Sequence, residues 1–251
     1  MSGLSYLCEY GGSDESESEE VTKKPKLPPP DLSKISTIPI DSHLDDPDQH
    51  NGRLRSFPHI RGNWATYAYI QYPQYDNLNE LLVQFKEVVR TINEPSYLCD
   101  NLHISVTKTI VLKYHLISEF TTSLQDSIKS LESFELGFQS VAVYTNEEKT
   151  RTFLALKTDH FSKKYLLKIT ESIDAVLSEF SLPKFYEDPS FHMSILWWNG
   201  DWKNIISEKI EELNGILMKD SEVALNTVTI KKVDCKVGNR FYQFCLDCNG
   251  G

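Results

Sequence analysis

The sequence predicts an α+β fold of two lobes, in which two antiparallel sheets flank a central cleft, helices lie outside, and a pseudo-twofold axis relates the lobes. Strand-like runs alternate with amphipathic helical runs from about residue 51 onward. Several strand-like runs are joined by short polar turns, as in antiparallel hairpins. A histidine and a serine two positions apart occur in two of these strands, at 103–105 and at 192–194. A strand-and-helix unit that occurs twice, with one such strand in each copy, accounts for all three observations.

The first 50 residues are expected to form a disordered tail, and residues 51–251 to form one domain of two lobes. The tail holds 11 acidic and 4 basic residues, a net charge of −7, in a chain of 251 residues whose total is −10. It contains an acidic, serine-rich run at 13–20 and three prolines at 28–30. Such a composition does not offset the entropy that is lost on ordering. The cluster Lys23-Lys24-Pro25-Lys26 is either a nuclear import signal or an ordinary part of a solvated tail.

The domain begins with a strand rich in β-forming residues and continues as a regular series of elements. Apolar residues of 78–92 recur at helical spacing, and Pro95 ends that helix. The polar segments at 146–149 and 238–239 are expected to be hairpin turns. In chain order we expect a strand at 65–70, a helix at 76–92, strands at 101–107 and 110–112, a helix at 115–133, strands at 134–144 and 150–156, a helix at 161–180, a strand at 189–198, a helix at 202–218, and strands at 223–236 and 240–246.

Each His-x-Ser run presents an imidazole and a hydroxyl on one face of its strand. Alternate residues of a strand share a face, so His103 and Ser105 point to one side and Ile104 to the other. His192 and Ser194 are related in the same way. A single strand histidine is more often a structural residue, but two copies 89 positions apart favour a shared catalytic cleft. There the histidines would act as general base and general acid, and the serines would donate hydrogen bonds to a charged oxygen.

The composition argues against several classes of protein. No run approaches the roughly 20 apolar residues of a membrane span, and the N-terminus lacks a signal-peptide pattern, so no membrane association is expected. Five scattered cysteines predict reduced thiols and an intracellular protein. Cys245 and Cys248 have no second Cys or His pair at zinc spacing, and no carboxylate cluster that would hold paired Mg²⁺ is evident, so we expect no metal. No other cofactor is expected. A net charge of only −3 for 51–251 argues against a bulk nucleic-acid binder, although a contact with one end of a strand remains open.

Several blocks of the sequence resemble a known family. Paired His-x-Ser motifs on a duplicated α/β scaffold are typical of the two-histidine (2H) phosphoesterase superfamily. Within it, the chain resembles the eukaryotic U6 small nuclear RNA phosphodiesterases, the enzymes that trim the 3′ end of that RNA, at 55–66 (RSFPHIRGNWAT), 144–153 (YTNEEKTRTF), 185–194 (FYEDPSFHMS) and 236–242 (KVGNRFY). The resemblance covers about 51–246, and no catalytic position departs from the family's pattern.

The resemblance implies a metal-independent 3′→5′ RNA exonuclease that acts on uridine or adenosine tails and leaves a 2′,3′-cyclic phosphate. It implies that His103 and His192 are the catalytic acid/base pair and that Ser105 and Ser194 bind phosphate. Tyr186 falls where the family places an aromatic residue that stacks on a base. The implied partner is the 3′ end of U6 small nuclear RNA, and the implied location is the nucleus.

The chemistry of the two motifs agrees with this resemblance. One neutral histidine would take the proton of a ribose 2′-OH, whose oxygen attacks the adjacent phosphorus, while the other histidine would protonate the departing 5′ oxygen. The near symmetry of the motifs leaves the two roles open, and we take His192 as the base and His103 as the acid. Lys149 and Arg151, two positions apart on the expected hairpin, either line a phosphate path or are solvated charges.

Two other functions are compatible with the same motifs. One is a 2′,3′-cyclic nucleotide phosphodiesterase of the same superfamily, against which the blocks at 144–153 and 185–194 argue. The other is a non-catalytic RNA 3′-end binder, against which the presence of both histidines argues. A single two-lobed domain with its own cleft needs no partner for activity, so we expect a monomer.

Overall fold

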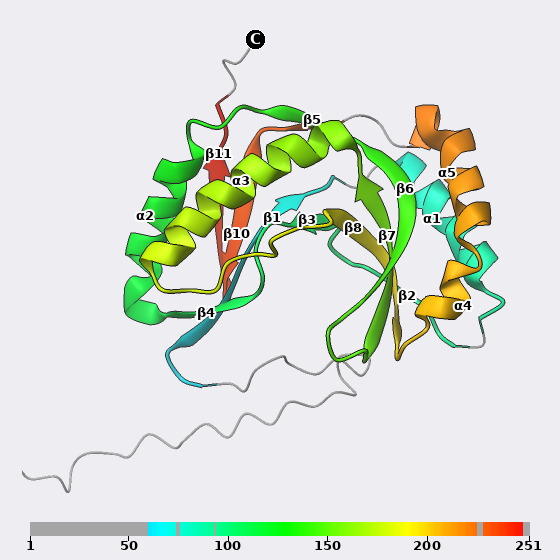
Figure 1. Cartoon of the computed structure of the whole chain (residues 1–251), viewed down its shortest axis with the longest axis horizontal. Coiled ribbons are helices and arrows are strands. Elements are labelled where there is room, and N and C mark those ends of the chain that lie inside the picture. Colours follow the sequence, from blue (N-terminus) through cyan, green and yellow to red (C-terminus); the bar gives the residue numbers. More distant parts are fainter. Residues whose placement is uncertain (1–59, 74–75, 93, 225–227, 248–251) are drawn as a thin grey trace, which may run out of the picture. The chain divides into compact units, whose positions relative to one another are not determined.

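The structure is a computed structural model that describes residues 60–73, 76–92, 94–224 and 228–247 (Figure 1). These residues all belong to one compact unit that begins at Asp45. The predicted tail at 1–50 lies outside the described residues. Within the described part of the chain, no helix is long and apolar enough to cross a membrane.

Antiparallel strands make up most of the fold. The strands of the main sheet are β1 (Asn63–Gln71), β2 (Tyr97–Leu98), β3 (His103–Ser105), β4 (Ile110–Lys113), β6 (Phe138–Thr145), β7 (Arg151–Thr158), β8 (His192–Asn199), β10 (Lys232–Val237) and β11 (Arg240–Cys245). They follow the order β11-β10-β1-β3-β8-β7-β6, with β4 also paired to β1 and β2 to β8. A separate two-stranded sheet pairs β5 (Phe134–Leu136) with β9 (Val228–Ile230). Every strand pair is antiparallel, which confirms the predicted α+β class.

The two expected sheets meet edge to edge through β3 and β8. One half consists of β11, β10, β1, β3 and β4, and the other of β2, β8, β7 and β6. The halves are not consecutive parts of the chain, because the C-terminal hairpin β10–β11 pairs with β1, the first strand. Each half contributes one His-x-Ser strand, and these two strands are the ones that join the halves.

Helices pack beside both halves of the sheet (Figure 1). They are α1 (Asp76–Val89), α2 (Ile117–Ile128), α3 (His160–Glu179), α4 (Lys203–Ser207) and α5 (Ile210–Ala224), with a 3-10 turn at Tyr114–Leu116 before α2. Helix α2 packs against α3 and β11, whereas α4 and α5 pack against β6, and α1 packs against α5. Each half of the sheet therefore has its own layer of helices.

Three predicted elements are divided in the structure. The strand expected at 223–236 is split into β9 and β10, which belong to different sheets, and residues 223–224 end helix α5. The helix expected at 202–218 is split into α4 and α5. The strand expected at 134–144 is split into β5 and β6 at Gly137, whose amide donates to Ser162 Oγ (2.9 Å) at the start of α3. A Cβ atom at Gly137 would overlap the carboxylate of Asp159, the residue that caps α3 by accepting from the Ser162 amide. The strand is therefore divided where the N-terminal end of α3 lies against Gly137. The periodicity of the strand residues does not indicate this contact.

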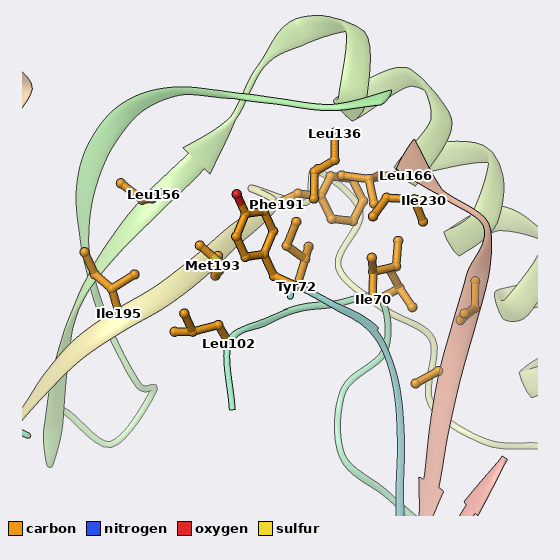
Figure 2. Close-up of a cluster of buried hydrophobic side chains, with 14 of the residues drawn as sticks. Ile70, Tyr72, Leu102, Leu136, Leu156, Leu166, Phe191, Met193, Ile195 and Ile230 are labelled. Carbon is orange, nitrogen blue, oxygen red and sulfur yellow. The ribbon is translucent and has the colours of Figure 1, made fainter. Parts of the chain in front are cut away.

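The hydrophobic core fixes which face of the two motif strands is presented to the cleft. Ile104, Met193 and Ile195 have no exposed surface. They pack in one cluster with residues of β1 and α3 such as Ile70 and Leu166, part of which is drawn in Figure 2. Full burial of such side chains contributes roughly 1.5–3 kcal/mol each. This burial anchors both strands with their histidines and serines on the opposite face.

Candidate active site

The pairing of β3 with β8 places the two His-x-Ser motifs directly across from each other. The strands run antiparallel with Ile104 opposite Met193. One residue further along this register, His103 faces Ser194, and Ser105 faces His192. Each histidine is thus the cross-strand neighbour of the other motif's serine, and a local twofold axis passes between Ile104 and Met193. The structure thus brings together the four predicted side chains of the two motifs.

Both imidazoles are oriented by the same kind of hydrogen bond. His103 Nδ1 lies 2.7 Å from the backbone oxygen of Asn101, and His192 Nδ1 lies 2.6 Å from that of Ser190. A carbonyl oxygen only accepts, so each Nδ1 carries a hydrogen and donates it. This fixes the tautomer of each neutral ring and leaves Nε2 for proton exchange with a ligand.

The aromatic surroundings of the two histidines differ. The ring of Tyr144 stacks on His192, with centroids 3.7 Å apart and planes 12° apart. Its hydroxyl also forms a 2.8 Å hydrogen bond with Ser190 Oγ, on the residue whose carbonyl orients His192. His103 instead meets the edge of Tyr69, with centroids 5.3 Å apart and planes 69° apart. His192 is therefore held on its face as well as at Nδ1.

Burial lowers the pKa of His192 below its ordinary value of 6.5. Its hydrogen bond to the Ser190 carbonyl opposes this effect, and the nearby charge of His103 adds to the lowering of the pKa. Burial also raises the pKa of Tyr144, so this phenol stays protonated beside the ring. His192 is consequently neutral at neutral pH, the state that a general base requires.

Two adjoining pockets flank the motifs and share Phe153 and Ser194. The first, called here the His103 pocket, has a volume of about 650 Å³, and the second, the His192 pocket, about 580 Å³. Both volumes fall within the range of about 300–1,000 Å³ that is usual for small-molecule sites. The His103 pocket is rich in aromatic and basic side chains, namely Tyr67, Tyr69, Phe153, Trp197, Phe241, Arg151 and Lys236. The His192 pocket includes Ser105, Lys108, Tyr144, Glu147, Tyr186 and Asp188.

The structure places the remaining predicted residues at different distances from the motifs. Tyr186 lines the His192 pocket with 48% of its surface exposed, and the ammonium of Lys108 lies 4.3 Å from its ring centroid. Arg151 lines the His103 pocket, where its guanidinium lies 5.9 Å from the ring of Phe153. Lys149 lines neither pocket; it lies in the β6–β7 turn with a φ of 54°, and its ammonium is 4.0 Å from Asp201. Of the two hairpin cations, only Arg151 faces the cleft.

A β-bulge adds a residue that strand periodicity did not predict. Leu154 of β7 pairs with Leu196, but the next residue, Ala155, pairs with Ser194, so β8 has one extra residue at this point. Strict alternation from His192 would place Leu196 on the cleft side. After the bulge, Trp197 lines the His103 pocket instead and stacks on Tyr97, with centroids 4.5 Å apart.

Tyr144 and Lys108 were also missed by the sequence analysis, although both lie close to the predicted residues. Tyr144 begins one of the family-like blocks, but its contact with His192 crosses β7 and depends on strand order. Lys108 follows Ser105 by three positions, and its charge alone did not indicate whether the side chain points into the cleft. Among the described residues, no group of three or more His, Cys, Asp or Glu side chains is arranged to hold a metal ion.

Comparison with known proteins gives consistent matches over most of the chain. The family model described as "HVSL: Uncharacterised conserved protein" matches residues 25–245. U6 snRNA phosphodiesterase 1 of Drosophila melanogaster is 35% identical over an alignment that covers 96% of this chain and 99% of that protein. U6 snRNA phosphodiesterase 1 of Mus musculus is 37% identical, with 88% and 84% covered.

Solved structures match the fold. Usb1 of Kluyveromyces marxianus superposes with a TM-score of 0.54 at 11% identity, over 75% of this chain and 100% of that one. The same protein with uridine monophosphate gives a TM-score of 0.52 at 12% identity, over 73% and 98%. At such low identity these matches bear on the fold alone.

Proposed function

We propose that this chain, which belongs to the family of U6 snRNA phosphodiesterases, is a 3′→5′ exoribonuclease that trims the oligouridine or adenosine 3′ end of U6 small nuclear RNA. The reaction is a metal-independent transesterification that leaves a 2′,3′-cyclic phosphate. The observation that carries the proposal is the β3–β8 pair, in which two oriented histidines each face the other motif's serine. The proposal includes action in the nucleus and as a monomer.

The reaction uses the Nε2 atoms of the two histidines, because each Nδ1 already donates to a backbone carbonyl. Neutral His192 takes the proton from the 2′-OH of the penultimate nucleoside, and the freed oxygen attacks the phosphorus of the terminal phosphodiester. The bond from phosphorus to the 5′ oxygen of the last nucleoside breaks, and protonated His103 gives its proton to that oxygen. The products are a free terminal nucleoside and an RNA that ends in a 2′,3′-cyclic phosphate. Proton exchange with water then returns both histidines to their starting states.

The two serines supply the electrostatic part of the mechanism. Ser105 and Ser194 lie diagonally across the β3–β8 pair, between the histidines. Their hydroxyls donate to the non-bridging oxygens of the phosphate, where negative charge increases during the attack. The histidine tautomers are fixed before substrate binds, so the site needs little reorganisation during the reaction.

The acid and base assignment gives the RNA a direction in the cleft. The attacking nucleoside belongs on the side of the base, in the His192 pocket, where Tyr186 can stack on its base. The leaving nucleoside belongs on the side of the acid, in the aromatic His103 pocket. Two pockets on either side of one phosphate site favour a substrate with a nucleoside on each side of the bond, rather than a lone cyclic nucleotide.

The test uses the full chain, EDTA, and RNA oligonucleotides that end in several uridines. An RNA with a single deoxyribose at the penultimate position loses the attacking hydroxyl and should resist removal of the last nucleoside. A matched RNA with deoxyribose only at the last position keeps that hydroxyl and should be shortened at about the normal rate. Mass spectrometry should find a cyclic phosphate on the shortened RNA.

Three results would oppose the proposal. Equal shortening of both substituted RNAs would exclude attack by the 2′-OH. Loss of activity on adding EDTA, restored by a divalent ion, would exclude the metal-independent reaction. Tight binding of the all-ribose RNA without any shortening would favour a non-catalytic 3′-end binder.

A further inference from the structure

We propose that Lys108 forms a second phosphate subsite, which binds the phosphate on the 5′ side of the attacking nucleoside. This inference rests on the proposed function, because it takes the direction of the RNA from the acid and base assignment. It adds a binding contact outside the scissile phosphate. The site would then recognise the RNA as far as the phosphate on the 5′ side of the attacking nucleoside.

Lys108 is placed to meet the RNA chain as it leaves the reacting centre. It follows Ser105 by three residues and lines the same pocket as Ser105, His192 and Tyr186. Its ammonium lies 4.3 Å from the centroid of the Tyr186 ring, which is a cation–π contact. Lys108 therefore adjoins the ring expected to stack on the base of the attacking nucleoside.

The charges around Lys108 make it the natural contact for an anion. It is the only lysine or arginine that lines the His192 pocket, as far as the described residues extend. The pocket also holds the carboxylates of Glu147 and Asp188, and Asp188 is already paired with Lys163 at 3.3 Å. None of the ion pairs among the described residues includes Lys108. An RNA backbone that enters this pocket thus meets two acidic groups and one cation, and its phosphate is most stable beside the cation.

The scissile phosphate does not need this lysine. In the proposed reaction that phosphate lies between Ser105 and Ser194, with a histidine on either side. The next phosphate along the RNA is the one on the 5′ side of the nucleoside stacked on Tyr186. A base stacking on the face that Lys108 covers displaces the ammonium toward this phosphate, so an ion pair replaces the cation–π contact.

The inference predicts that a single added phosphate strengthens binding. The dinucleotide UpU lacks the 5′ phosphate, and pUpU has it. With deoxyribose in the first sugar neither is cleaved, so their dissociation constants can be measured by calorimetry without turnover. We expect the full chain to bind the 5′-phosphorylated form about fivefold more tightly, the size of a favourable, partly exposed ion pair. We expect Lys108→Gln to bind both forms equally, with the affinity of the wild-type chain for the unphosphorylated one.

Two variants serve as controls. Lys108→Arg keeps the charge and should retain the preference for the phosphorylated form. Lys129→Gln removes a lysine that pairs with Asp126 on the surface at α2, and it should bind both forms like the wild-type chain. Equal melting temperatures would show that all variants are folded.

Each outcome is decisive for the inference. Equal weakening of both ligands by Lys108→Gln would mean that the lysine contacts the scissile phosphate or the base, and would overturn it. An unchanged preference in that variant would overturn it as well. Failure of the proposed function has a different signature, because all-ribose UpU and pUpU would then bind without being cleaved, whatever the effect of Lys108.

Discussion

The two His-x-Ser motifs share one backbone geometry but lie in different chemical surroundings. In both, the imidazole Nδ1 donates to the carbonyl oxygen two residues earlier, Asn101 in one and Ser190 in the other. In β8 the ring is also covered by Tyr144, and burial lowers the pKa of His192. In β3 the ring instead has an edge contact with Tyr69 and a more distant, tilted contact with Tyr67. A nearly twofold scaffold thus holds its two histidines in unequal surroundings, and those of His192 favour the neutral ring that a general base requires.

The largest effects are expected from removing either histidine. His103→Ala and His192→Ala each delete one proton-transfer group, and such groups contribute about 10²–10⁴ in rate. We expect losses of this order in single-turnover trimming of an oligouridine RNA. The double variant should be little worse than either single one, because the two groups act in the same step. A variant that retains more than a tenth of the normal rate would remove its histidine from the mechanism.

The two motifs are alike in their serines, so removing either serine hydroxyl should have a similar effect on the rate. Ser105→Ala and Ser194→Ala should each lower kcat by about 10²-fold, because each removes one donor to the charged phosphate oxygens. Their diagonal arrangement predicts similar losses in kcat with smaller changes in KM. A loss confined to one variant would show that only that hydroxyl contacts the phosphate.

The two motifs differ in the ring of Tyr144, which stacks on His192. Removing this ring should make the surroundings of the two histidines more alike. Tyr144→Leu exposes His192 to water, so the pKa of His192 should rise toward its ordinary value of 6.5. Because a base works only when neutral, the acidic limb of the kcat/KM profile should move upward toward pH 6.5, with a loss of up to about tenfold at pH 5.5 and little loss at pH 7. NMR titration of the His192 ring would follow the same shift.

Two matched variants separate the stacking from the hydrogen bond. Tyr144→Phe keeps the ring but loses the contact with Ser190, so its pH profile should stay close to that of the wild-type chain. Tyr69→Leu removes the edge contact of His103 and should leave the acidic limb in place. An unchanged profile in Tyr144→Leu would show that the stacked ring does not control His192.

The smallest effects are expected from the hairpin cations. Arg151 lines the His103 pocket, so Arg151→Gln should raise the KM for RNA about threefold with little change in kcat. Lys149 lies beside Asp201 outside both pockets, so Lys149→Gln should change neither constant by more than about twofold. Steady-state kinetics at low salt would compare them, and a larger effect of Lys149 would place the RNA on the outside of the hairpin.

Much of the site could be predicted because its central residues follow strand periodicity. The alternation of buried and polar residues at 103–105 and 192–194 gave both histidines, both serines and the face that each presents. The repetition of the motif indicated a shared cleft, and the hairpin turn at 238–239 lies between β10 and β11 as expected.

The remaining features depend on contacts that no local pattern reports. Trp197 reaches the cleft because a bulge shifts the register of β8 by one residue. Tyr144 covers His192 from a strand two positions away in the sheet, and the pairing of the C-terminal hairpin with β1 joins the two ends of the domain. Periodicity gives the face of a side chain, whereas strand order decides which side chains meet.

In the proposed reaction the two histidines have opposite roles, and a substrate with a good leaving group distinguishes the acid from the base. Uridine 3′-(4-nitrophenyl phosphate) has the attacking 2′-OH but releases a phenolate that needs no proton. We expect His103→Ala to cleave this ester within about tenfold of the wild-type rate, whereas His192→Ala should remain slower by about 10² or more. Rescue of His192→Ala instead would reverse the assignment, and equal loss in both folded variants would contradict the acid/base pair.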